Sequence, residues 1–214
     1  MKYVMRLRAR PDKLMIAEKH MRLVSYLSKL SGPFGLRSSD FPSPDCGQEL
    51  SARFELGKEL GKGIKGFVRY RFRGGLEDQG DHDDLLDLEF DPRKMDYSIL
   101  LREVFPCYVR AFQPYFGFIG DEEFTYVDFD RSRNTNSRYE LIRFYPTAYY
   151  SNWFCANSLG LSAEELVGRV GDLIVKSELF DDGVILVGAD SPIDLDRAEE
   201  FNVMMQKRLS MPRG

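Results

Sequence analysis

The chain has 214 residues, of which 43% are hydrophobic and 13% aromatic, and its net charge at pH 7 is −4. This composition excludes a disordered chain, and the mild negative charge argues against a general nucleic-acid-binding protein, whose affinity would come from lysine and arginine. No apolar run approaches the roughly 18 residues of a membrane-spanning helix, and the N-terminus lacks the apolar core of a signal peptide. We therefore expect a cytoplasmic protein that binds neither nucleic acid nor membrane.

The first part of the chain predicts strands and one helix. Partial alternation predicts a strand at 2–9, and apolar residues at three- and four-residue spacing predict a helix from Pro11 to about Leu30. Two segments without a regular period follow: a predicted loop rich in Gly, Pro and Ser at 31–47, and a segment at 49–60 that is ambiguous between strand and helix.

The middle of the chain mixes all three kinds of element. Aromatic or aliphatic residues alternate with arginine in FVRYRFR (67–73), which is typical of a strand, and LLDLEF (85–90) predicts another. Residues 95–113 predict a helix that Pro106 starts, kinks or splits. Three more strands are predicted around the polar turn RSRNTNS: 115–120, 123–130 and 139–145.

The last quarter carries the clearest signals. Ser162 precedes Glu165 by three residues, which predicts a capping box at a helix start. LIVKSELF, DDG and VILVGA (173–189) predict a hairpin, and a last helix is predicted at 194–209. Together the pattern predicts an α+β fold, with a mostly antiparallel sheet packed with about four helices in a single domain. A division into two subdomains, about 1–92 and 93–214, is left open.

The stretch LEDQGDHDDLLDLEFD (76–91) holds eight carboxylates and no lysine or arginine. It could be a solvated loop, a metal site or a docking surface for a positively charged partner. A zinc or iron site usually needs several imidazoles or thiolates, and the chain has only His20 and His82. The calcium-loop pattern is not matched either. We therefore expect no metal and no cofactor, and keep a metal-dependent hydrolase using the Asp81–Asp84 cluster with His82 as the alternative.

Other catalytic patterns are weaker still. GKELGKGIKG (57–66) does not have the spacing of a phosphate-binding Walker A loop, and G-x-S-x-G does not occur. Cys155 has no nearby histidine and is expected to be a buried thiol. Trp153 lies in the aromatic stretch FYPTAYYSNWF, where it is expected in the core or at its edge, or as an interface anchor if exposed.

The docking interpretation makes a structural prediction. Alternation in 85–90 places Asp87 and Glu89 on one face of the strand and the apolar side chains on the other. Such a carboxylate row could meet a basic surface through charge complementarity. The predicted partner-binding residues are Asp81, Asp83, Asp84, Asp87, Glu89, Asp121, Glu122 and Trp153.

From about residue 110 to 210, the chain resembles immunity proteins of bacterial polymorphic-toxin and type VI secretion systems. It is most similar to the α+β group that neighbours restriction-endonuclease-fold toxins. The resemblance rests on the order of elements, on Trp153 in its aromatic segment, on Gly183 before a strand and on 190–194 before the last helix. It implies a non-enzymatic cytoplasmic protein that binds and neutralises a cognate toxin. The alternatives are the metal-dependent hydrolase and a scaffold whose basic N-terminal helix meets an acidic partner.

If the acidic stretch is the docking surface for a toxin, expected to be a nuclease, then Asp83→Lys combined with Asp87→Lys should weaken toxin binding by orders of magnitude. Losing one partner of a close interfacial charge pair costs about 2–5 kcal/mol. Because these side chains are predicted to be exposed, the fold should survive. Titration calorimetry with the toxin checks this, and an unchanged affinity would contradict the assignment.

Overall fold

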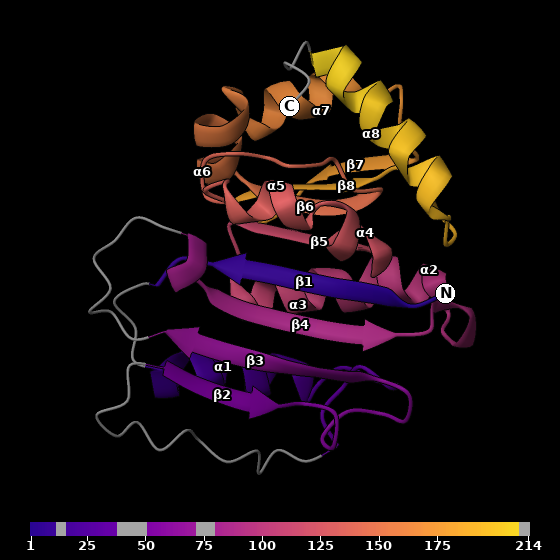
Figure 1. Ribbon diagram of the computed structural model, residues 1–214. Coiled ribbons are helices and arrows are strands. Elements are labelled where there is room, and N and C mark those ends of the chain that lie inside the picture. Colours follow the sequence, from indigo (N-terminus) through magenta and orange to yellow (C-terminus); the bar gives the residue numbers. More distant parts are fainter. Residues whose placement is uncertain (12–15, 38–50, 72–79, 210–214) are drawn as a thin grey trace.

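The computed structural model describes residues 1–11, 16–37, 51–71 and 80–209 (Figure 1). The strands are β1 (Tyr3–Ala9), β2 (Ser51–Glu55), β3 (Lys65–Arg71), β4 (Asp84–Phe90), β5 (Phe116–Asp121), β6 (Thr147–Ser151), β7 (Lys176–Leu179) and β8 (Gly183–Val187). The α-helices are α1 (Ile16–Leu27), α2 (Tyr97–Ile99), α3 (Phe105–Phe112), α4 (Glu123–Val127), α5 (Phe129–Arg133), α6 (Asn152–Phe154), α7 (Ala163–Val170) and α8 (Leu195–Leu209). Short 3-10 helices lie at Gly80–His82 and Pro92–Lys94, and π-helical turns at Leu100–Val104 and Cys155–Leu159.

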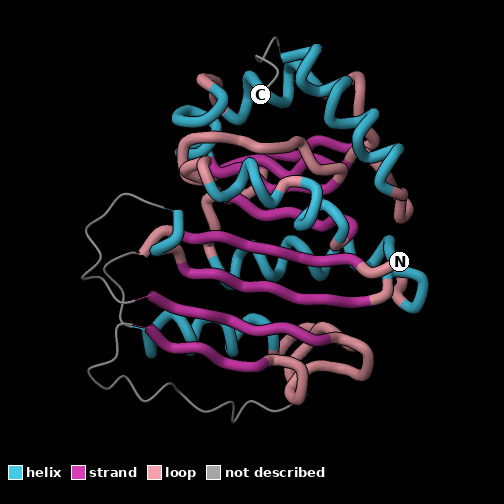
Figure 2. Tube along the Cα trace, in the orientation of Figure 1, coloured by secondary structure: helices cyan, strands magenta, loops and turns pink. Residues whose placement is uncertain are grey.

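The strands form one eight-stranded sheet in the order β2-β3-β4-β1-β5-β6-β8-β7, and every pair in it is antiparallel. Figure 2 shows the strands in magenta with the helices in cyan around them. This confirms the predicted α+β class. Four helices in the described part of the chain, α1, α3, α7 and α8, have eight or more residues. The strands before residue 92 make one half of the sheet, and β1 pairs directly with β5 at its centre. The two-subdomain division stays a prediction.

The two faces of the sheet are covered in different places. Alternate residues of β1 and β4, such as Leu7 and Leu88, are fully buried in a core shared with α1 and α3. On the opposite face, side chains of β6 and β8 such as Tyr150 and Leu186 form a second core with α7 and α8. In the described residues no helix packs on this second face over β2, β3 and β4 (Figure 1). Half of one sheet face is therefore left uncovered by the helices of the described ranges, and we call this half the open face.

Most of the predicted elements are confirmed. The strands at 2–9, 67–73 and 85–90, the C-terminal hairpin and the last helix occur with small shifts at their ends, and 49–60 contains a strand. The capping box is present, with Ser162 and Glu165 each bonded to the other's backbone N–H. Pro106 lies in the first turn of α3, after a π-helical turn. Most of the loop predicted at 31–47, and residues 72–73 of the predicted strand, lie outside the described residues.

Two predicted strands are wrong. Residues 123–130 form α4 and the start of α5, because β5 is already paired with β1 and β6 and offers no edge. Acidic residues in the first turn also favour a helix start here. Residues 139–145 form no strand, since Arg143 and the backbone N–H of Phe144 bond to side chains at Asp128 and Asn202. The segment crosses the sheet face instead, where Tyr145 stacks on Phe118 with ring centroids 3.7 Å apart.

The core contacts predict a clear difference between two leucines on strands. Leu86 in β4 is fully buried, whereas Leu179 in the edge strand β7 is 52% exposed. Leu86→Ala should lower the free energy of unfolding by about 2–5 kcal/mol, because it removes buried methyl groups and leaves a cavity. Leu179→Ala, the matched control, should change it by less than about 1 kcal/mol. Urea denaturation measures both, and equal effects would contradict this description of the core.

Candidate functional site

The centre of the acidic stretch is buried and internally neutralised. Asp83 is 0% exposed and accepts hydrogen bonds from Nε of Arg138 at 2.8 Å and from the hydroxyl of Tyr115 at 2.7 Å. Asp84 is 2% exposed and accepts from Nζ of Lys19 at 2.6 Å. The prediction that Asp83 and Asp84 form an exposed docking surface is wrong, because the fold uses both carboxylates to tie β4 to α1 and to the segment after α5.

The predicted carboxylate row on β4 is also incomplete. Asp87 and Glu89 share a face as expected, but Asp87 is buried and accepts a hydrogen bond from Nε of Arg6 at 2.7 Å. Glu89 and Asp81 are exposed. The double lysine substitution would replace the buried Asp83 by a cation that faces the guanidinium of Arg138, so with this geometry we expect it to destabilise the fold as well. Residues 77 and 78 of the stretch lie outside the described residues.

The remaining predicted contacts lie elsewhere. Asp121 is buried, and in the strand register it lies opposite Tyr3 at the start of β1. Asp84 lies opposite Ala9 at the end of β1. At about 3.3 Å per residue these two carboxylates lie at ends of β1 about 20 Å apart, so the predicted residues do not form one patch. Glu122, partly exposed, contacts Lys2 with 3.5 Å between the charged atoms.

Trp153 lies at the edge of the second core, as expected. Its ring packs edge-on against Tyr115 with centroids 5.8 Å apart, and the guanidinium of Arg10 lies 3.8 Å above it. Cys155 is buried as predicted, and burial raises the pKa of its thiol to about 12. A protonated, buried thiol is a poor nucleophile.

The metal-dependent alternative finds little support in this geometry. In the described ranges no group of three or more His, Cys, Asp and Glu side chains is arranged to hold a metal ion. Burial raises the pKa of Asp83, although its bonds to Tyr115 and Arg138 act in the opposite direction. With Lys19 and Arg138 already beside them, Asp83 and Asp84 have their charges balanced without a metal.

The open sheet face is instead rich in cations. Strand alternation places six basic and three acidic side chains of β1 to β4 on it. The basic residues are Arg6, Arg8, Arg53, Lys65, Arg69 and Arg71, and the acidic ones are Glu55, Asp87 and Glu89. The sequence carried the signal in the arginines that alternate through FVRYRFR, but the pattern alone did not reveal that no helix covers this face.

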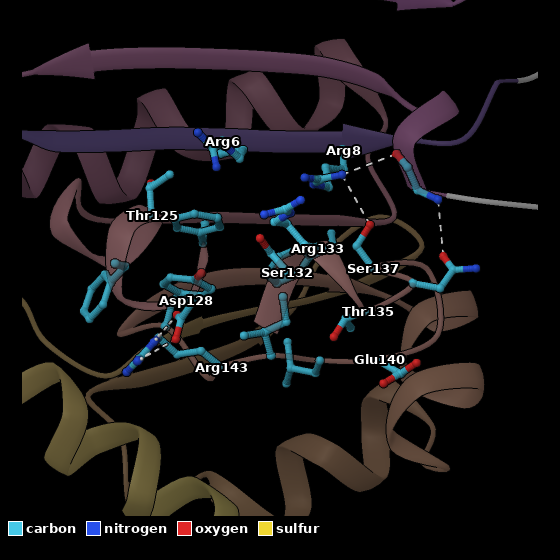
Figure 3. A pocket seen from close by; sticks show the side chains of 18 of the residues that line it. Arg6, Arg8, Thr125, Asp128, Ser132, Arg133, Thr135, Ser137, Glu140 and Arg143 are labelled. Carbon is cyan, nitrogen blue, oxygen red and sulfur yellow. Dashed lines mark hydrogen bonds and ion pairs between the residues drawn. The ribbon is translucent and has the colours of Figure 1, made fainter. Parts of the chain in front are cut away.

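A cavity of about 650 Å³ lies where the open face meets the covered half of the sheet (Figure 3). Arg6 and Arg8 of β1 line one side, and the chain from α4 to Tyr145 lines the other. Arg8 donates hydrogen bonds to the hydroxyl of Ser137 at 3.2 Å and to the carbonyl of Gly80 at 3.4 Å. Arg133 also lines the cavity. These guanidinium and hydroxyl groups are donors suited to a carboxylate or another oxyanion.

An apolar ridge stands beside this cavity. On α4 and α5, Tyr126 is 79% exposed, Val127 55% and Phe129 54%, while Thr125 and Asp128 of the same helical segment line the cavity. Aromatic residues and arginine are the types enriched in the centres of protein interfaces. We define the candidate docking surface as this ridge (Tyr126, Val127 and Phe129) together with the open face of β1 to β4.

Comparison with known proteins supports the fold. No protein family and no curated protein matches the chain in sequence. Among solved structures, the Pseudomonas aeruginosa T6SS protein PA0821 has a similar fold, with a TM-score of 0.60 and 12% sequence identity over 97% of this chain and 75% of that one. Within the described residues, every helix is too short or too polar to cross a membrane.

The buried ion pairs predict different roles for two neighbouring carboxylates. Asp83→Asn should lower the free energy of unfolding by about 3–5 kcal/mol, because it removes the buried negative charge to which the Arg138 guanidinium and the Tyr115 hydroxyl both donate hydrogen bonds. Asp81→Asn, at an exposed position, should change it by about 0.5 kcal/mol or less. Thermal and chemical denaturation compare the two, and an Asp83→Asn protein as stable as the wild type would refute the structural role of this carboxylate.

Proposed function

We propose that this chain is an immunity protein that binds a cognate toxin of a type VI secretion system in the cytoplasm and covers its active site or substrate cleft. The observation that carries the proposal is the exposed ridge of Tyr126, Val127 and Phe129 beside an arginine-bearing sheet face. The fold similarity to a T6SS protein supports the same context. The resemblance seen in the sequence order of residues 110–210 points the same way.

Physical chemistry favours a binding protein at this surface. Exposed apolar side chains on one short segment are unfavourable in water, and exposed apolar patches commonly mark interaction sites. Tyrosine and arginine are frequent among the few residues that dominate the affinity of an interface. The arrangement combines an apolar anchor with charges around it, which suits a stable complex between folded proteins.

The acidic residues keep a smaller part in the proposal. Asp81, Glu89 and Glu122 remain at least partly exposed and are available at the rim of an interface. Rim charges mainly affect the association rate and its salt dependence. The expectation that the toxin is a nuclease depends on a continuous acidic surface. Since several of these carboxylates are buried, the nuclease stays a prediction without added support from the structure.

The scaffold alternative depends on basic residues near the N-terminus. Several of these have internal partners: Lys19 pairs with Asp84, and Arg22 donates to the carbonyl of Ala111 at 3.0 Å. The helix α1 therefore has fewer positive charges available for an acidic partner. This alternative has less support than toxin binding.

Co-expression with a candidate toxin, taken from the genes that flank this one, tests the proposal. The immunity protein should restore growth to cells that express the toxin and should co-purify with it in a fixed stoichiometry. A catalytically inactive toxin serves as the control, since it should be bound equally well without any effect on growth. If the chain neither binds the toxin nor protects the cells, the proposed function is wrong.

The ridge predicts two substitutions that separate binding from folding. Tyr126→Ala and Phe129→Ala should each weaken toxin binding by about 2 kcal/mol or more, the size typical of aromatic anchors, while the melting temperature stays within a few degrees. Tyr26→Ala on α1, which packs on the other face of the sheet, is the matched control and should leave the affinity unchanged. Calorimetric titration gives the affinities. Equal affinities for all three variants would remove the ridge from the interface.

A further inference from the structure

Three arginines lie in one row across the open sheet face. Arg53 is directly opposite Arg69, and Arg69 and Arg8 are both directly opposite Leu85. Neighbouring strands are about 4.8 Å apart, so Arg53 and Arg69 stand close together, while Arg8 lies one strand further along on the same face, beyond Leu85 of β4. We name Arg53, Arg69 and Arg8 the arginine row. Like charges directly opposite each other destabilise a sheet, so the Arg53–Arg69 pair within the row is unfavourable in the isolated protein.

Only one end of the row has a carboxylate partner on the same face. Arg53 pairs with Glu55 at 3.0 Å and lies 3.7 Å above the ring of Phe67. Within the described residues, Arg69 and Arg8 form no ion pair, and the buried Nε of Arg69 has no hydrogen-bond partner. Arg69 on β3, and Arg8 on β1 at the other end of the row, thus carry charges that no carboxylate of the described residues pairs with.

The titration of Arg69 agrees with this geometry. Burial lowers the pKa of its guanidinium, and the positive charges of Arg71, Arg8 and Arg53 lower it further, while Asp81 acts in the opposite direction. A partly buried cation among other cations gains most when a negative charge approaches. The environment of Arg69 is therefore one that an external carboxylate would improve.

We propose that an acidic segment of the partner protein lies along the arginine row, with one carboxylate at Arg69 and another at Arg8 beside the cavity. The inference rests on the proposed function and names the chemistry of the toxin surface that this chain recognises. The ridge on α4 and α5 supplies the apolar contact next to it, and Arg133 and the hydroxyl of Ser137 line the recess near Arg8. The sign of the recognition is opposite to that expected from the acidic stretch.

An acidic protein segment fits this surface better than nucleic acid does. Nucleic acid needs a continuous basic surface, because its phosphates are closely spaced along the backbone. Here Glu55, Asp87 and Glu89 lie between the cations on the same face, and the whole chain carries a charge of −4. A protein surface with mixed charges can match both signs, and the exposed aromatic ridge adds contacts typical of protein interfaces.

The test compares wild type with three arginine-to-glutamine variants. Arg69→Gln and Arg8→Gln change the row, and Arg169→Gln on α7 removes an exposed cation from the covered half of the sheet as a matched control. The probes are a labelled deca-glutamate peptide and a labelled DNA duplex of about ten base pairs, and fluorescence anisotropy is read at low and at physiological salt. Melting temperatures report the fold, and Arg69→Gln should melt no lower than wild type because it relieves repulsion.

Wild type and Arg169→Gln should bind deca-glutamate within about twofold of each other, and Arg69→Gln and Arg8→Gln at least about tenfold more weakly, as expected for loss of a close charge pair. Equal binding by all four proteins, or no binding by wild type at low salt, overturns the proposal. Tighter binding of the duplex that falls in the same two variants overturns it in favour of nucleic acid.

The same proteins separate this inference from the proposed function. If wild type captures the toxin and Arg69→Gln captures it equally well, the arginine row is not the contact and the proposed function stands. If wild type does not capture the toxin, the proposed function fails, and the peptide titration still decides whether the row recognises acidic segments.

Discussion

Three ion pairs on and beside β4 determine which charges of this protein remain for a partner. Asp83 binds Arg138, Asp84 binds Lys19, and Asp87 binds Arg6. They join β4 to the segment after α5, to α1 and to β1. Breaking a buried ion pair costs several kcal/mol, because the favourable interaction between the two buried charges is lost while the cost of burying the remaining charge stays. The acidic stretch that looks like a surface in the sequence is thus largely part of the interior.

The charge balance of the outer face follows from those pairs. Asp84 and Asp87 of β4 bind internal cations, while β3 contributes Arg69 and Arg71 to the half of the sheet face on which no helix of the described chain packs. A sheet face with uncompensated arginines reduces stability slightly, and proteins retain such features where function requires them. The exposed aromatic residues of α4 and α5 are also unfavourable for the stability of the isolated protein. Two adjoining parts of the surface therefore each lower its stability.

Local signals predicted local structure well. The capping residues Ser162 and Glu165, and the apolar runs around the turn before Gly183, involve neighbours in sequence, so a single chain suffices to find them. Alternation also identified β4 and the face shared by Asp87 and Glu89. It could not reveal the partners of Asp83 and Asp84, because Arg138 and Lys19 are 55 and 65 residues away. Alternation likewise predicts a strand at 123–130, because it cannot show that β1 and β6 already occupy both edges of β5.

The central claim is that the toxin binds the open sheet face and the α4–α5 ridge. Hydrogen exchange of the protein with and without its toxin tests this most directly, because it reports each segment separately. The account predicts that toxin slows exchange in β3 (Lys65–Arg71) and in residues 123–133, and leaves α7 and α8 unchanged. Slower exchange confined to α7 and α8, with β3 and 123–133 unaffected, would contradict it.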